Sequence, residues 1–130
     1  MSRIVVDTDV ASYILNWHSS APAYVEALRG ATLILSFMSL AELRAGAFAA
    51  NWGPRRLQLL EQFIEGFAVV YPDDAMCTSW ASIRARARAA GRGLSPQDAW
   101  IAATAISTNA DLATNNQSDF ANIESRLLKI

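Results

Sequence analysis

The stretch Ile4-Val5-Val6-Asp7-Thr8-Asp9 determines which fold the rest of the chain can build. Three β-branched residues in a row are typical of a buried strand, and the acids and threonine that follow are typical of a helix N-terminus. We therefore expect a strand that ends at Asp7 and a helix that begins directly after it. Such a junction is the first unit of an α/β fold.

The same alternation continues along the chain. Further strand-like runs lie at 32–37, 67–71, 111–114 and 123–129, and helical segments begin near residues 10, 22, 39, 54, 74 and 95. This order predicts a three-layer α/β/α sandwich around a central, mostly parallel sheet of four or five strands. No linker or repeat interrupts it, so residues 1–130 are expected to form one domain.

Composition and charge limit the classes of protein to consider. Apolar residues make up 52% of the chain and charged residues 18%, which is typical of a folded domain with apolar surface left for a partner. The net charge of -1 provides no overall positive field, so a binding site for a polyanion must be built locally. Lys129 is the only lysine; the other ten basic residues are arginines.

Cysteine and histidine usage excludes two kinds of site. Cys77 and His18 are the only residues of their types, so neither an intrachain disulfide nor a zinc site of Cys/His type is available. We expect a reducing, cytoplasmic setting. The first apolar run is too short for a signal peptide, and no run approaches the ~18 apolar residues of a membrane span.

Asp7 and Asp9 follow the first strand, at the edge of a parallel sheet where ligands bind. Asp7 is a candidate site residue, and its alternative role is a turn acid that caps the next helix. Asp9 is the better cap, so we assign it first to structure and second to the surroundings of the site.

Glu42 lies on a predicted helix for which Ser39 is a plausible cap. Its face is small and largely apolar, because Ala45 and Ala49 share it while Arg44 points the opposite way. A surface glutamate is the ordinary explanation, but this apolar face favours an inward carboxylate.

Asp98 has a simple structural explanation and a conflicting one. Ser95-Pro96-Gln97-Asp98 resembles a helix capping box, which needs no function. However, the apolar residues three, four and seven positions on share the face of Asp98, and the polar side is predicted to consist of Thr104, Ser107 and Thr108. Asp98 is therefore expected to point toward the core.

A buried carboxylate is costly unless it is paired, protonated or bound to a cation. No lysine is available inside the chain, and three converging acids favour a metal ion over an arginine or backbone partner. Oxygen ligands without histidine or cysteine suit Mg²⁺ or Mn²⁺. Asp119, which ends the polar loop 114–118, is a fourth candidate, and its loop is also explained as an ordinary turn.

The order of these motifs resembles the PIN domain, and most of all its VapC-type toxins. The resemblance rests on Val6-Asp7-Thr8, Ser39-Leu-Ala-Glu42, Asp98-Ala-Trp-Ile and Thr114-Asn-Asn with Asp119-Phe120, and spans nearly the whole chain. It implies an Mg²⁺-dependent ribonuclease that uses metal-activated water, with metal and catalytic acids Asp7, Glu42, Asp98 and Asp119. Thr8, Asp9, Ser39, Thr114 and Asn116 would surround them. It also implies an RNA substrate, a cognate antitoxin and a second copy of the chain as partners.

The fourth acid departs from the usual pattern of that family. Many PIN domains place an acid two residues after the threonine, where this chain has Asn116. Asp119 matches an alternative acidic position just before the aromatic residue.

An RNA backbone would need cations around such an acidic site. Arg84, Arg88 and Arg92 recur every four residues and would form one stripe if their helix continued through Gly91. The alternative is an ordinary solvated helix face.

Two other functions remain open from the sequence. Asp7-Thr8-Asp9 also resembles the motif of aspartate-nucleophile phosphatases, but these need a downstream lysine or arginine near the phosphate, usually lysine, and Lys129 is poorly placed. A catalytically inactive PIN-like interaction module would use the acids only as caps.

Overall fold

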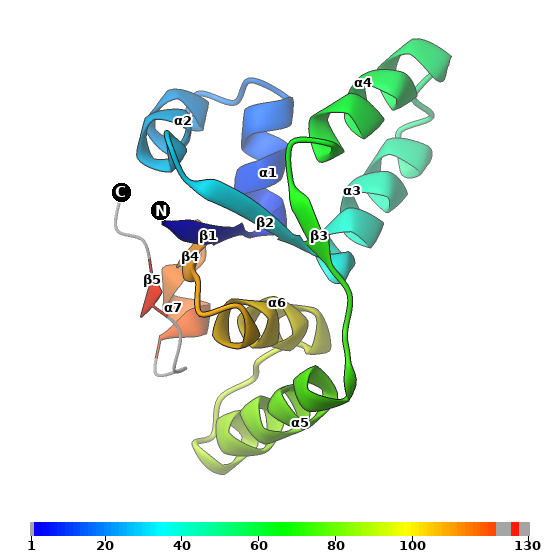
Figure 1. Ribbon diagram of the computed structural model, residues 1–130. Coiled ribbons are helices and arrows are strands. Elements are labelled where there is room, and N and C mark those ends of the chain that lie inside the picture. The colour runs from blue at the N-terminus through cyan, green and yellow to red at the C-terminus, as the bar shows by residue number, and fades with distance from the viewer. Residues whose placement is uncertain (1, 122–125, 128–130) are drawn as a thin grey trace.

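The computed structural model describes residues 2–121 and 126–127. Its central sheet is all parallel, with strand order β3-β2-β1-β4-β5 (Figure 1). The strands are β1 (Arg3–Val6), β2 (Thr32–Ser36), β3 (Ala68–Val70), β4 (Asp111–Ala113) and β5 (Arg126–Leu127). The predicted parallel sheet is therefore confirmed. Of the predicted last strand, residues 123–125 and 128–129 lie outside the described residues.

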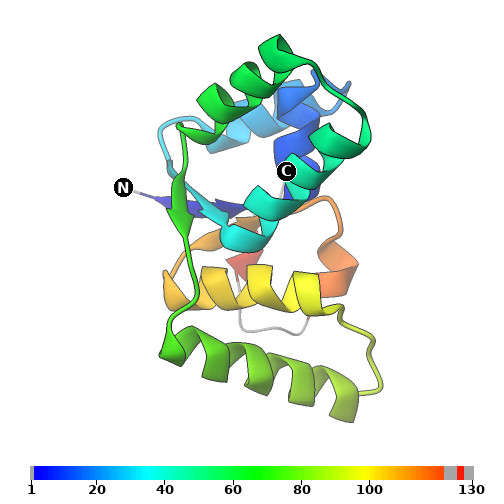
Figure 2. The same cartoon turned by 90° about the vertical axis from the view of Figure 1, so that its right-hand side faces the viewer.

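Helices cover both faces of the sheet, as predicted for a three-layer sandwich. One side carries α1 (Thr8–Leu15), α2 (Ala21–Leu28), α3 (Phe37–Ala49) and α4 (Pro54–Ile64), and the other carries α5 (Asp74–Ala89), α6 (Pro96–Ser107) and α7 (Gln117–Phe120). Figure 2 shows α6 between the sheet and α5. None of the described helices is both long and apolar enough to cross a membrane.

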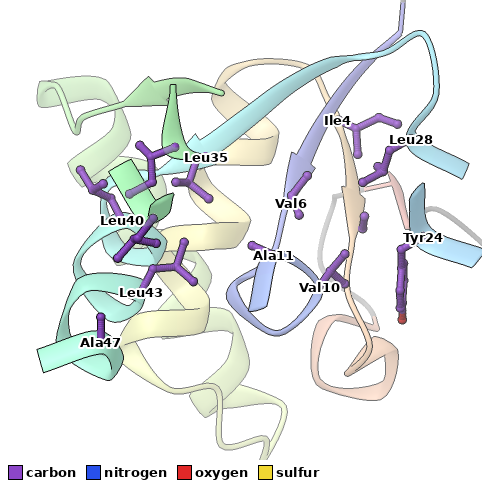
Figure 3. Packing of buried hydrophobic residues seen from close by; sticks show 13 residues of the cluster. Ile4, Val6, Val10, Ala11, Tyr24, Leu28, Leu35, Leu40, Leu43 and Ala47 are labelled. Atoms are coloured by element: carbon purple, nitrogen blue, oxygen red, sulfur yellow. The ribbon is translucent and has the colours of Figure 1, made fainter. Parts of the chain in front are cut away.

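Alternation along β1 divides the core in two. Ile4 and Val6 pack with α1 to α4, and the buried residues of that side are shown in Figure 3. Val5 points to the opposite side and packs against α5, α6 and α7. Since successive strand residues face opposite ways, a strand segment covered on both faces must be continuously apolar, and this is why residues 4–6 of β1 are all apolar.

Two local predictions were wrong. The loop before Phe120 contains the short helix α7. The cap of α3 is Ser36, whose Oγ accepts a hydrogen bond from Met38 N at 3.1 Å, and Ser39 is instead buried within the first turn. Because the last residue of β2 is itself the cap, the strand passes into the helix without a loop.

Candidate active site

Asp7 is a buried acid at the carboxyl end of β1. Its side chain accepts hydrogen bonds from Thr8 N at 2.8 Å and from Thr114 Oγ1 at 2.6 Å, and the residue is only 4% exposed. Burial raises its pKa from 3.8 to about 7, and the nearby charge of Asp9 is the next largest cause. A carboxylate held in this way is costly at neutral pH unless something positive joins it.

The helix cap was assigned to the wrong aspartate. Asp7 is the N-cap of α1, while Asp9 lies in the first turn. The half-buried carboxyl of Asp9 accepts from Val10 N at 2.6 Å and from Asn115 N at 3.2 Å. Burial is also the main cause that raises the pKa of Asp9. We call the group of Asp7, Asp9, Glu42, Asp98 and Asp119 the acidic corner. Asp9 belongs to it more closely than the sequence indicated.

Glu42 is tied to the start of α1 from the neighbouring helix α3. Thr8 Oγ1 lies 2.8 Å from both Ser39 Oγ and Glu42 Oε1, so these three side chains form one hydrogen-bonded cluster. Glu42 is half-buried, whereas Arg44 is exposed on the other side and pairs with Glu61. The predicted inward orientation of Glu42 is confirmed, and the surface-glutamate explanation does not hold.

Asp98 meets both explanations offered for it. Its backbone N donates to Ser95 Oγ at 3.0 Å, which confirms Ser95 as the cap of the helix. Its side chain is half-buried, and its pKa is raised, first by burial and then, against the opposing hydrogen bond to Ser95, by the charges of Asp119, Glu42 and Asp9. Asp98 therefore lies in the first turn of a helix that Ser95 caps, and the charges of the other acids act on its carboxyl.

The predicted polar side of α6 was wrong at Thr104. This residue is fully buried and donates to Trp100 O at 2.8 Å, so its hydroxyl is satisfied within the helix. Local bonding of this kind lets a threonine occupy a core position that the sequence pattern assigns to the surface.

Asp119 and Asn116 lie at the outer side of the corner. Asp119 is exposed on α7, and its charge acts on Asp98. Asn116 is exposed, and its backbone N donates to Thr114 Oγ1 at 3.0 Å. Thr114 thus joins the β4–α7 segment to Asp7.

No cation among the described residues neutralises these acids. The ion pairs found there are Arg29–Glu26 and Arg44–Glu61, both at the surface. The oxygen-only donor set fits a hard divalent cation. In the described part of the chain, no group of three or more acid, histidine or cysteine side chains is placed so that it could hold a metal ion. Mg²⁺ is commonly held by one or two carboxylates with several waters, so the corner fits it without such a group.

The condition for a single arginine stripe, a helix that continues through Gly91, is not met. The helix ends at Ala89, and Gly91 has φ +70°, which turns the chain away. Arg84 donates to Leu94 O at 3.2 Å and Arg92 to Ala121 O at 3.0 Å, while Arg88 is exposed. The proposed RNA contact of the three arginines stays a prediction.

Comparison with known proteins identifies relatives over almost the whole chain. Residues 4–125 match the family described as PIN domain. The VapC ribonuclease Y4jK of Sinorhizobium fredii is 33% identical over 128 residues, covering 90% of this chain and 89% of the relative. Ribonuclease VapC1 of Haemophilus influenzae is 29% identical over 121 residues, covering 92% and 90%.

Solved structures show the same similarity. VapBC-1 from nontypeable Haemophilus influenzae has a TM-score of 0.82 at 28% identity, with 96% of each chain covered. VapBC2 from Rickettsia felis, bound to a DNA fragment from its promoter, has a TM-score of 0.84 at 25% identity, with 98% of this chain and 97% of that chain covered.

Proposed function

The chain belongs to the PIN domain family, within which its relatives are VapC ribonucleases, and from this premise we propose that it is a metal-dependent endoribonuclease acting as the toxin of a toxin-antitoxin pair. Under this proposal Asp7 is a metal ligand and not a nucleophile, so the proposal excludes the phosphatase alternative. The proposed metal ligands are Asp7, Glu42 and Asp98, with Mg²⁺ or Mn²⁺ as the ion.

The observation that carries the proposal is the buried carboxylate of Asp7. It lies at the sheet edge where parallel α/β folds bind ligands, and the charges of Asp9 and Asp98 both raise its pKa. Several acids placed close together without an ion pair repel one another and lower the stability of the fold. Selection for stability alone would therefore not favour this arrangement. A divalent cation removes this penalty and gives the acids a common role.

The chain's own residues hold the acids in place. Thr114 fixes one oxygen of Asp7, and the backbone N–H of Thr8 fixes the other. Thr8 Oγ1 orients Glu42, and the cap at Ser95 fixes the start of the helix that carries Asp98. A bound divalent cation would supply Lewis-acid chemistry, by activating a water nucleophile and stabilising charge on the phosphate. No covalent attachment to the protein is required.

The proposed partners are an antitoxin and a second copy of the chain. The solved relatives are VapBC complexes, which supports the antitoxin. Large apolar side chains remain available for contacts on α3 and α4, where Phe48 is 66% exposed and Leu59 is 51% exposed.

The test is metal-dependent cleavage of RNA by Asp98→Asn. Because asparagine removes the charge but keeps the size, we expect cleavage to fall by at least about 100-fold while the protein stays folded. Asp74→Asn, an exposed acid in the first turn of α5, is the matched control and should keep full activity. A folded Asp98→Asn protein with undiminished Mg²⁺-dependent cleavage would contradict the assignment. A wild-type protein that binds neither Mg²⁺ nor Mn²⁺ would favour the inactive interaction module.

A further inference from the structure

An open hollow of about 540 Å³ lies beside the acidic corner, between α2 and the segment that joins β4 to α7. Its walls include Ser20, Tyr24, Thr114, Asn115, Gln117 and Ser118. We propose that this hollow binds the base and ribose of an unpaired nucleotide next to the scissile phosphate, and that the side-chain amide of Asn115 reads the base. The inference rests on the proposed ribonuclease function and adds a site for substrate selection.

The hollow and the acids share one stretch of chain. Thr114, in the wall, donates to Asp7 Oδ2, and the backbone N–H of Asn115 donates to Asp9 Oδ2. A phosphate held at the acids would therefore place the adjoining nucleotide at this wall. Neighbouring parts of one substrate can thus occupy two chemically different sites.

The chemistry of the walls suits a base and a sugar, and does not suit a phosphate. None of the described residues that line the hollow is charged. They offer hydroxyl and amide groups, which form hydrogen bonds with base edges and with the 2′-hydroxyl of ribose. Single-stranded RNA is recognised mainly through such groups, and an asparagine amide is well suited to pair with the edge of a base.

Two tyrosines hold the Asn115 amide in a defined orientation. Tyr24 OH donates to Asn115 Oδ1 at 3.2 Å, and Asn115 Nδ2 lies 3.4 Å from Tyr13 OH, to which it donates. Tyr24 is buried in the core that Figure 3 shows, and Tyr13 stacks on His18 with ring centroids 4.3 Å apart. Both rings are thereby fixed.

Asn115 itself is exposed. Its amide keeps one N–H and one oxygen lone pair beyond the two tyrosine contacts, which is what a base edge requires. In this arrangement Tyr13 and Tyr24 are positioning residues, and Asn115 is the residue that contacts the substrate.

The experiment compares RNA binding with metal binding in the full-length chain. Short labelled homopolymers of A, C and U, and an abasic strand, are titrated into Asp98→Asn protein with and without Asn115→Ala. For the Asp98→Asn protein, which is the parent here, we expect the binding affinities for the best and worst base to differ by about tenfold. Adding Asn115→Ala should reduce this ratio of affinities to below about twofold. Tyr24→Phe, which keeps the ring and loses only the hydroxyl, should reduce the ratio by about threefold. Gln58→Ala, an exposed amide on α4, is the control and should change nothing.

Calorimetry with Mg²⁺ alone separates this site from the acids. The bond to Asp9 comes from the backbone of Asn115, so Asn115→Ala in the otherwise wild-type chain should bind Mg²⁺ as the wild type does. The inference is overturned if the base preference survives Asn115→Ala, if the parent shows no preference, or if Asn115→Ala weakens Mg²⁺ binding. Absence of RNA cleavage by the wild type, with base-dependent binding intact, would contradict the proposed function alone.

Discussion

The acidic corner and the arginine stretch 84–92 use charged side chains in opposite ways. At the corner, the charges of acids on three other helices act on Asp98, and no ion pair with a described residue neutralises these acids. Along the arginine stretch, the end of α5 at Ala89 separates Arg92 from Arg84 and Arg88, and Arg84 and Arg92 each donate to a backbone carbonyl. The acids of the corner have no cationic partner among the described residues and are available to a ligand. Arg84 and Arg92, in contrast, stabilise the fold through hydrogen bonds to backbone carbonyls.

This difference shows what burial adds to a charge. Burial raises the pKa of Asp7 and Asp98, and the charges of neighbouring acids raise it further. Arg88, by contrast, is exposed to solvent, where a single charge interacts weakly. We therefore expect substitutions at the corner to have much larger effects than substitutions on the arginine stretch.

Asp7→Asn should have the largest effect. The substitution removes the carboxylate of a proposed metal ligand. RNA cleavage should therefore fall by roughly 1000-fold, as it does when other groups that stabilise the transition state are removed. The same substitution should stabilise the metal-free protein at neutral pH, because it removes a buried charge. Cleavage assays and denaturant unfolding of one preparation measure both effects.

The pH dependence of stability gives an independent check on Asp7. Its pKa rises from 3.8 to about 7 on folding, so between these values the folded chain holds more protons than the unfolded chain. The free energy of unfolding of the metal-free protein should therefore decrease as the pH rises through this window. Asp7→Asn should flatten that profile and be more stable than the wild type above pH 7 by about 1–3 kcal/mol. An unchanged profile would contradict the shifted pKa.

Asp9 and Asp119 test which acid completes the corner. Asp9 is half-buried, and its charge is a major cause of the raised pKa of Asp7, whereas Asp119 is exposed and acts on Asp98. We expect Asp9→Asn to weaken Mg²⁺ binding by about tenfold and Asp119→Asn by about threefold or less, as measured by calorimetry. Asparagine has a single acceptor oxygen, so Asp9→Asn also loses one of the two backbone hydrogen bonds, from Val10 N or from Asn115 N, that the two carboxylate oxygens accept. The reverse order would assign the fourth position to Asp119.

Much of the fold was predictable because its signals are local. The β-branched run at 4–6 and the Ser95-Pro96 cap each determine a structure within a few residues, and both predictions are confirmed. The cap of α3 was not predictable with the same certainty, since Ser36 and Ser39 are both suitable residues and only the end of β2 selects between them. Thr104 was misplaced because its hydroxyl is satisfied by its own helix.

The sequence predicted which residues belong to the site better than it predicted how these residues contact one another. The acids could be named from their positions at strand ends and helix starts, and Glu42 from its apolar neighbours. That Asp9 lies beside the β4–α7 segment depends on a contact with Asn115, which is 106 residues away in sequence. The same holds for the contacts of Asn115 with Tyr13 and Tyr24. Contacts of this kind leave no periodic signal in a single sequence.

Arg88→Ala should have the smallest effect and tests the other half of the comparison. If Arg88 contacts one phosphate, its removal should weaken binding of single-stranded RNA by about two- to fivefold at low salt and lower the salt slope by about 0.7. Arg84→Ala should instead reduce stability by about 1 kcal/mol, because Arg84 donates to Leu94 O and lies over the Trp80 ring. Arg55→Ala, an exposed arginine on α4, controls for the loss of one charge. An Arg88→Ala protein with the wild-type salt slope would make this part of α5 an ordinary solvated face, and the cations that bind the RNA backbone would then have to lie elsewhere on the protein.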